Sequence, residues 1–226
     1  MMLIELKAKI KGTKYLPFEQ DGKTYNLYDM PKGFVIKGNL DLSNKSLTEL
    51  PDLSEVVVKG SFNCNTNQLT SLEGAPKEVG EDFDCRYNNL TSLEGAPKEV
   101  GRSFYCNGNN LTTLEGAPQT VGGGFRCYYN QLTSLVGLPL MKKSMRIYCD
   151  GSLGNKYGFS TMASYEKLCE SPLYRSEDAM NRVRNKLPQE KIETKPASKK
   201  QQEAFEKINA EFSQWLKDNS AKPTRE

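Results

Sequence analysis

The chain has 226 residues and a formal net charge of +3, and 37% of its residues are hydrophobic. This apolar fraction is low for a globule with one compact core, but it suits a protein in which each repeated coil buries one short set of side chains. No stretch reaches the about 18 apolar residues of a membrane-spanning helix, and residues 1–12 lack the continuous apolar run of a signal peptide. We therefore expect a cytoplasmic protein that does not bind a membrane.

Residues 1–37 do not repeat, and their pattern predicts β-structure. Apolar and polar residues alternate over residues 3–10 and again over residues 24–28, and Asp21-Gly22 between them supplies a turn. An open end of a stack of coils would expose its core. We expect residues 1–37 to form a β-hairpin that caps the first coil.

Residues 38–150 contain a strict repeat of 21 residues. Four full copies align on Cys64, Cys85, Cys106 and Cys127, and the unit reads F-x-C-x-x-N-x-L-T-S-L-E-G-A-P-K-E-V-G-x-x. Alternating Phe, Cys and Leu predict a short strand with one buried face, and Gly-Ala-Pro predicts a non-helical return, so we expect extended or 3₁₀-like segments on the opposite side. The Asn after each strand predicts an Asn ladder between coils. Degenerate copies around Leu40 and Ile147 bring the stack to about six coils.

This unit resembles the leucine-rich repeat pattern L-x-L-x-x-N-x-L, with Phe and Cys in the first two apolar positions. Its short period is most similar to the bacterial short-repeat type seen in secreted effectors. Its E-G-A-P-K-E-V-G form is similar to repeat proteins encoded by bacteriophages and their bacterial hosts. The resemblance covers about residues 38–150 and implies a mainly β solenoid. It also implies a small protein of the bacterial host cytoplasm that binds a host protein, for example a defence component, and inhibits or redirects it.

The cysteines follow the repeat rather than a disulfide or metal pattern. Five of them occupy a position that Leu usually fills, and we interpret them as reduced core residues: Cys64, Cys85, Cys106, Cys127 and Cys149. Disulfides between adjacent coils are the alternative, although parallel in-register strands orient these side chains poorly for the bond. The chain has no C-x-x-C pair, no His, no P-loop and no G-x-G-x-x-G motif. We therefore expect no metal, no cofactor, no catalytic residues and no enzymatic activity.

Within nearly identical repeats, three positions around each Cys vary, and the buried face of the strand requires them to point outward. They carry a Tyr- and Arg-rich set that we expect to form a partner-binding patch on a concave face: Asp84, Arg86, Tyr87, Tyr105, Arg126, Tyr128 and Tyr129. Tyr and Arg bury much area with few rotatable bonds, which is why they dominate the energetics of protein interfaces. The alternative is that exposed Tyr merely suits a strand.

After Asp150 the pattern becomes helical. Residues 151–187 contain two predicted helices, at 160–169 and 176–187, and residues 188–197 form a charged, Pro-bounded linker. Residues 198–219 predict an amphipathic helix with a strongly apolar face, and residues 220–226 a disordered tail. The apolar face could pack on the repeats, on a second copy in a homo-oligomer, or on a partner: Phe205, Ile208, Phe212, Trp215 and Leu216.

Charge leaves an alternative partner open. Residues 41–140 hold 7 basic and 12 acidic residues, whereas residues 141–200 hold 13 basic and 7 acidic residues. The basic segment would be the contact surface of a nucleic-acid or nucleoprotein binder: Lys142, Lys143, Arg146, Arg182, Arg184 and Lys186. A structural component of a phage particle is a third hypothesis. The repeat and its Tyr- and Arg-rich positions favour the first one, a non-enzymatic module that binds a protein.

Overall fold

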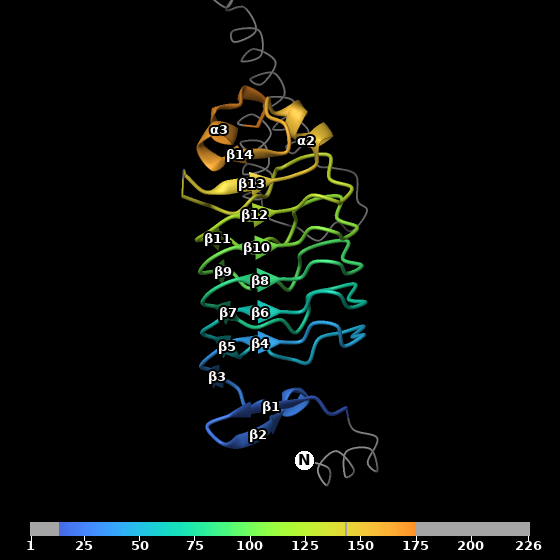
Figure 1. The fold of residues 1–226 in the computed structure, drawn as a ribbon, viewed down its shortest axis with the longest axis vertical. Coiled ribbons are helices and arrows are strands. Elements are labelled where there is room, and N and C mark those ends of the chain that lie inside the picture. Colours follow the sequence, from blue (N-terminus) through green and yellow to red (C-terminus); the bar gives the residue numbers. More distant parts are fainter. Residues whose placement is uncertain (1–13, 143, 175–226) are drawn as a thin grey trace, which may run out of the picture. The chain divides into compact units, whose positions relative to one another are not determined.

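The computed structural model describes residues 14–142 and 144–174, and these residues form a solenoid of short parallel β-strands (Figure 1). Each central coil contributes one strand to each of two sheets. The first is a seven-stranded sheet of β4 (Leu40–Asp41), β6 (Phe62–Asn63), β8 (Phe83–Asp84), β10 (Phe104–Tyr105), β12 (Phe125–Arg126), β13 (Arg146–Tyr148) and β14 (Met162–Ser164). The second is a five-stranded sheet of β3 (Val35–Ile36), β5 (Val57–Val58), β7 (Glu78–Val79), β9 (Glu99–Val100) and β11 (Thr120–Val121). The predicted β-solenoid is confirmed.

The repeat period sets the register of both sheets. Phe62, Phe83, Phe104 and Phe125 are direct partners on neighbouring parallel strands, and Ile147 continues the row. The pairing of β3, β5, β7, β9 and β11 into a second sheet was not predicted, because strands of two residues are too short to show a periodic pattern.

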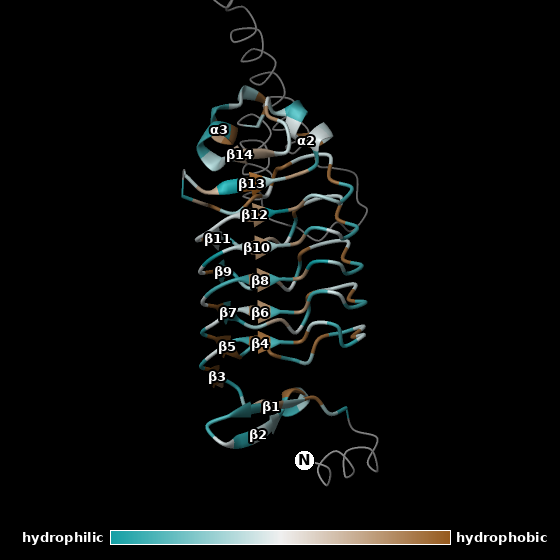
Figure 2. Cartoon of the chain, in the orientation of Figure 1, coloured by the Kyte–Doolittle hydropathy of each residue, from teal (hydrophilic) through white to brown (hydrophobic). Residues whose placement is uncertain are grey.

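Identical side chains from successive coils stack on one another in the core. The four Phe rings follow each other with centroid separations of 5.2, 5.1 and 5.4 Å. The Cys, Leu and Val positions of the repeat are also buried, and Figure 2 shows hydrophobic residues recurring along the strands of successive coils. The core is therefore a thin column, as the low apolar fraction predicts.

The expected Asn ladder is present. The side-chain amide nitrogen of Asn88 donates to the carbonyl of Cys85 in its own coil (3.2 Å) and to that of Cys64 in the preceding coil (3.1 Å). Its side-chain oxygen accepts from the backbone N–H of Leu69 at 3.0 Å. Asn109 and Asn130 repeat this arrangement one and two coils later. Each Asn thus joins two coils where the chain leaves the strand.

Glycines allow the coils to approach closely beside the five-stranded sheet. A Cβ atom on Gly80, Gly101 or Gly122 would overlap the carbonyl oxygen of the residue one coil earlier, which is Lys59, Gly80 and Gly101 respectively. Because any side chain would push the coils apart here, these three coils require Gly at this position.

The N-terminal end carries the expected hairpin. β1 (Pro17–Gln20) and β2 (Lys23–Asn26) pair antiparallel around Asp21-Gly22, and a 3₁₀ turn, η1 (Leu27–Asp29), follows. Both turn residues have positive φ, as a two-residue hairpin turn of type I′ requires. The Gln20 side chain accepts from the N–H of Lys37 and donates to the carbonyl of Val35, which covers the outer edge of β3. The alternating residues 3–10 lie outside the described residues.

The C-terminal end differs from the prediction of one helix over residues 160–169. Residues 162–164 form β14, which pairs antiparallel with β13, and two short helices flank it: α2 (Gly151–Lys156) and α3 (Tyr165–Glu170). The last coil would otherwise leave the edge of β13 unpaired, and β14 satisfies it. The helix starts only at Tyr165, where the Ser164 side chain accepts from the N–H of Lys167.

Candidate functional site

The variable positions of the repeat lie on the outer face of the seven-stranded sheet. They form rows along the stack, because parallel in-register strands place equivalent residues side by side. The strand row consists of Asp41, Asn63, Asp84, Tyr105, Arg126 and Tyr148. The following row, two residues further along each coil, consists of Ser43, Asn65, Arg86, Asn107, Tyr128 and Asp150.

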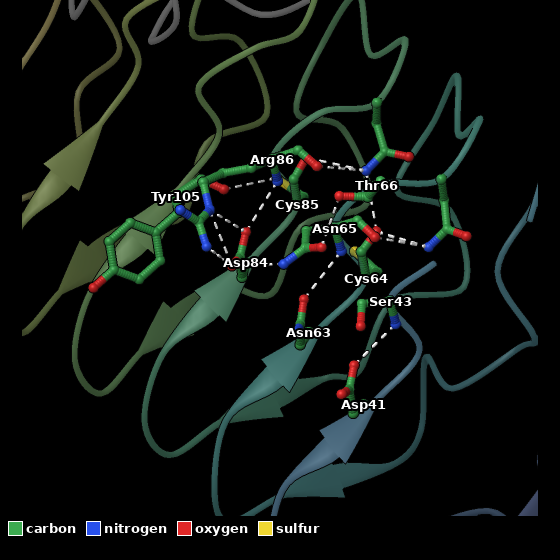
Figure 3. A network of polar contacts seen from close by, with 12 residues as sticks. Asp41, Ser43, Asn63, Cys64, Asn65, Thr66, Asp84, Cys85, Arg86 and Tyr105 are labelled. Atoms are coloured by element: carbon green, nitrogen blue, oxygen red, sulfur yellow. Dashed lines mark hydrogen bonds and ion pairs between the residues drawn. The ribbon is translucent and has the colours of Figure 1, made fainter. Parts of the chain in front are cut away.

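The first three members of the strand row shape the backbone. The side-chain oxygens of Asp41, Asn63 and Asp84 each accept a hydrogen bond from the N–H two residues later, at 2.9, 3.1 and 3.1 Å (Figure 3). Such bonds stabilise the bend at the end of a strand. The first three side chains of the strand row therefore stabilise the backbone of their own coils.

Arg86 is anchored by an ion pair within its own coil. Its Nε lies 2.9 Å from Oδ1 of Asp84, and its Nη2 lies 2.6 Å from Oδ2. The Asp84 side chain is 12% exposed, and its hydrogen bonds raise the pKa of the Arg86 guanidinium above its ordinary value. Asp84, predicted as a contact residue, is therefore placed on this face as the residue that orients Arg86.

Beyond Asp84, cationic and aromatic groups alternate across four coils. The Arg86 guanidinium lies 5.4 Å from the ring centroid of Tyr105, and the Arg126 guanidinium lies 5.1 Å from the rings of both Tyr105 and Tyr148. We call Arg86, Tyr105, Arg126 and Tyr148 the Arg–Tyr ladder. Each contact is within cation–π range and restrains long side chains before any partner binds.

Arg126 differs from Arg86 in its polar contacts. Among residues 14–142 and 144–174, no carboxylate forms a hydrogen bond or ion pair with Arg126. Its guanidinium is held by two aromatic rings, and its N–H donors remain open to a ligand.

Tyr87 and Tyr129 project beside the ladder from a strained backbone. Their φ values are 53° and 54°, in the left-handed region, and the equivalent position one coil after Tyr87 is Gly108 with φ 70°. Tyr87 is 52% exposed and Tyr129 is 68% exposed. Tyr129 contacts Tyr128 edge to face at 5.0 Å. A bulky residue in this conformation costs about 1–2 kcal/mol relative to Gly.

A shallow depression of about 350 Å³ lies between the first three residues of the strand row and the Arg–Tyr ladder. Its walls include Asn63, Asp82, Asp84, Arg86, Tyr105 and Arg126. A second depression, of about 550 Å³, lies on the five-stranded sheet above the row of Gly80, Gly101 and Gly122. None of the residues that line the second depression is aromatic or Arg, so the chemistry of the two faces differs.

The five cysteines of the core are buried and protonated rather than reactive. All six are free, and five belong to the core, with the thiols of Cys85, Cys106 and Cys127 donating to carbonyls of the next coil at 3.3–3.4 Å. Burial raises the pKa of the core thiols, to about 12 for Cys149. No cluster of three potential metal ligands occurs in the part of the chain that the structure describes.

The structure brings together Arg86, Tyr105 and Arg126 and places Tyr128 and Tyr129 next to each other. Sequence reasoning missed Tyr148, which occupies the same strand-row position in the degenerate coil of Ile147 and Cys149. It also gave no weight to Asn107, whose buried side chain has no hydrogen-bond partner among the residues that the structure describes. The periodic position would have identified Tyr148, whereas the burial of Asn107 depends on its neighbours.

The predicted helix face of Phe205, Ile208, Phe212, Trp215 and Leu216 lies outside the described residues, as do the basic residues Lys143, Arg182, Arg184 and Lys186. In the ranges 14–142 and 144–174, no helix is long and apolar enough to cross a membrane. Comparisons of the chain with protein-family models, with curated proteins and with solved structures each found no match.

Proposed function

We propose that this chain is a non-enzymatic protein-binding module and that its partner binds the outer face of the seven-stranded sheet. The observation that carries the proposal is the Arg–Tyr ladder, in which two guanidinium groups and two phenol rings alternate at distances of 5.1–5.4 Å. Tyr and Arg are enriched among residues that dominate binding energy. Because the ladder restrains them in advance, less side-chain entropy is lost on association.

The strained tyrosines support the same face. Gly108 demonstrates that the turn accepts Gly, yet Tyr87 and Tyr129 occupy the equivalent position and leave more than half of each side chain exposed. An exposed aromatic residue in a left-handed conformation contributes little to folding. Binding is the role that accounts for it.

The size of the face fits a protein partner when both rows take part. Four coils at a strand spacing of about 4.8 Å place the ends of the ladder roughly 15 Å apart. A stable interface buries about 800 Å² on each side, so the ladder alone is too small. The adjoining Tyr87, Tyr128 and Tyr129 enlarge the surface that a partner can contact.

The acidic character of the repeats argues for a protein and against nucleic acid. Residues 41–140 carry 12 acidic and 7 basic residues, and Asp82 and Asp84 line the depression beside the ladder. A phosphate backbone that ran along the stack would meet these carboxylates, whereas, among the described residues of this face, Arg126 offers unpaired positive charge at one point only. We further propose, on the resemblance of the repeats alone, that the partner is a bacterial protein in the cytoplasm that a phage or bacterial binder inhibits or redirects.

The test is affinity capture from a bacterial lysate with the full chain as bait. We expect the variant Tyr105→Ala with Tyr128→Ala to lose the captured protein. A matched variant on the other sheet, Glu78→Ala with Glu99→Ala, should retain it, since both glutamates are exposed on the opposite face. Tyr105→Phe keeps the ring and should also retain capture. If the double tyrosine variant captures the same protein at the same level, the assignment of this face is wrong.

A further inference from the structure

Asn107 is a buried polar side chain without a partner. It is 0% exposed, and neither its side-chain nitrogen nor its side-chain oxygen forms a hydrogen bond with any described residue. It lies on the outer face, in the row that follows the strand row, between Arg86 in the preceding coil and Tyr128 in the next. Leaving a buried amide unpaired destabilises a fold, and Asn107 therefore requires an explanation.

The equivalent residue two coils earlier shows why Asn107 is unpaired. The side-chain nitrogen of Asn65 donates to Oδ2 of Asp84, the strand-row residue of the next coil, at 3.2 Å (Figure 3). For Asn107 the corresponding residue is Arg126, which has no acceptor and whose guanidinium lies against two tyrosine rings. Asn65 thus faces a carboxylate in the next coil, whereas Asn107 faces Arg126. The Asn107 amide has no acceptor at this position, and the Arg126 guanidinium has no carboxylate among the described residues.

Long side chains from the neighbouring coils flank Asn107. Arg86 and Tyr128 occupy the same row as Asn107, one coil before it and one coil after it. The ring of Tyr87 lies over the adjacent Gly108, where an added Cβ would come within 2.6 Å of Cδ1 of Tyr87. Tyr87 and Tyr128 both belong to the outer face, and half of the Tyr87 side chain is exposed.

We propose that Asn107 binds the main chain of an extended partner segment and that Arg126 binds an acidic side chain of the same segment. A carboxamide carries one acceptor and two donors, which match the N–H and C=O of a peptide unit. The Arg126 guanidinium, already oriented by Tyr105 and Tyr148, pairs with a carboxylate in a charge-assisted hydrogen bond. Tyr87 and Tyr128 move from Asn107 onto the bound segment. This inference rests on the proposed function and names the chemistry of its partner.

The geometry favours a short acidic motif. Arg86 is neutralised by Asp84, so Arg126 is the guanidinium of the ladder that remains for a partner. Adjacent coils are separated by about 4.8 Å, and extended chain rises about 3.3 Å per residue, so the amide that meets Asn107 and the acidic residue that meets Arg126 are close neighbours in sequence.

The experiment selects a display library of random peptides against the full chain and measures the affinity of the enriched peptides. We expect enriched peptides to share an Asp or Glu. Asn107→Ala should weaken them roughly ten- to hundredfold, as the loss of two hydrogen bonds in a dry site predicts. The same variant should keep or raise the melting temperature, because it removes an unsatisfied amide. Asn65→Ala is the matched control: it loses the bond to Asp84, lowers the melting temperature and leaves peptide affinity unchanged.

A second readout observes Asn107 itself. In the isotopically labelled full chain, the NMR signals of its side-chain amide protons should shift on addition of an enriched peptide, and those of Asn65 should not. Unchanged Asn107 signals, or an Asn107→Ala variant that binds enriched peptides as tightly as the wild type, would overturn the inference.

The outcomes also separate this inference from the proposed function. If peptides depend on Tyr105 but not on Asn107, the face binds proteins and the role of Asn107 is wrong. If no peptide is enriched although the full chain still captures a protein through Tyr105, the peptide inference fails and the binding face stands. If the enriched peptides bind the Tyr105→Ala variant unchanged, both proposals fail. Salt-sensitive binding of a single-stranded oligonucleotide that displaces the peptides would also contradict both, because it would make nucleic acid the ligand.

Discussion

Replacing Asn109 with Ala should strongly destabilise the solenoid, because Asn109 is a central member of the Asn ladder. Asn109 is 7% exposed, and its side chain donates to the carbonyls of Cys85 and Cys106 and accepts from the N–H of Leu90, all at 3.1 Å. Both carbonyls keep a second donor, from Asn88 and Asn130. The Leu90 N–H keeps none among the described residues.

The magnitude follows from this inventory. Three hydrogen bonds with a net contribution of about 1 kcal/mol each are lost, and the orphaned N–H adds a desolvation cost that is partly included in that figure. We expect a loss of about 2–4 kcal/mol in the free energy of unfolding, measured by urea denaturation followed by circular dichroism. Asn89→Ala, at the exposed position that follows Asn88 in the preceding coil, should change it by less than about 0.5 kcal/mol.

The Asn109→Asp variant tests the direction of the side-chain bonds. Its carboxylate would face the carbonyl oxygens of Cys85 and Cys106, so the folded-state pKa of the new Asp should lie above its unfolded value of about 3.9. Its destabilisation should therefore be greatest at neutral pH and diminish as the pH falls toward 4, where the protonated acid can donate. Two results would refute the Asn ladder as a source of stability. One is a loss below about 0.5 kcal/mol in the free energy of unfolding of Asn109→Ala. The other is a destabilisation by Asn109→Asp that does not change with pH.

Three further predictions concern the close contacts, the thiols and the strained turn. Gly101→Ala should unfold or severely destabilise the chain, because its Cβ would overlap the Gly80 carbonyl. Gly38→Ala should be tolerated, since nothing lies within 4 Å of a Cβ there. Thermal melting of both variants tests this difference. The Cys149 thiol has a pKa of about 12 in the folded chain, against the ordinary value of 9.0, so between these pH values the unfolded thiol ionises before the folded one. The free energy of unfolding should therefore fall by about 1.4 kcal/mol per pH unit for this residue as the pH rises. In urea titrations, Cys149→Ala should show a shallower decline. Tyr129→Gly should leave stability unchanged or raise it by up to about 1 kcal/mol, because relief of the left-handed strain offsets the entropy cost of Gly; a clear loss in the urea midpoint would show that Tyr129 is a folding residue.

The repeated part of the fold could be predicted because each repeated residue has a local reason. Phe, Cys and Leu are spaced as a strand requires, and the Asn of each coil meets the carbonyl of the previous one only if the period is constant. The hairpin turn at Asp21-Gly22 was likewise visible, since both residues accept positive φ. Periodicity therefore determined most of the solenoid.

The two ends and the second sheet depended on tertiary contacts. Residues 162–164 become a strand because β13 offers an edge, and nothing in the short Met-Ala-Ser stretch indicates this in isolation. In the candidate site, sequence positions identified outward-facing Tyr and Arg residues, but not their alternation into a ladder. The exclusion of Asn107 from water also required the structure, because burial depends on the side chains of neighbouring coils.

The most direct test of partner binding at the Arg–Tyr ladder is site-specific photo-crosslinking in bacterial cells. A photoreactive amino acid would replace Tyr129, which is 68% exposed beside the ladder, or Glu99, which is exposed on the five-stranded sheet. We predict that position 129 forms a crosslink to one protein and that position 99 does not. Equal crosslinking at both positions, crosslinking only to nucleic acid, or the same yield after Tyr105→Ala would contradict the proposed binding face.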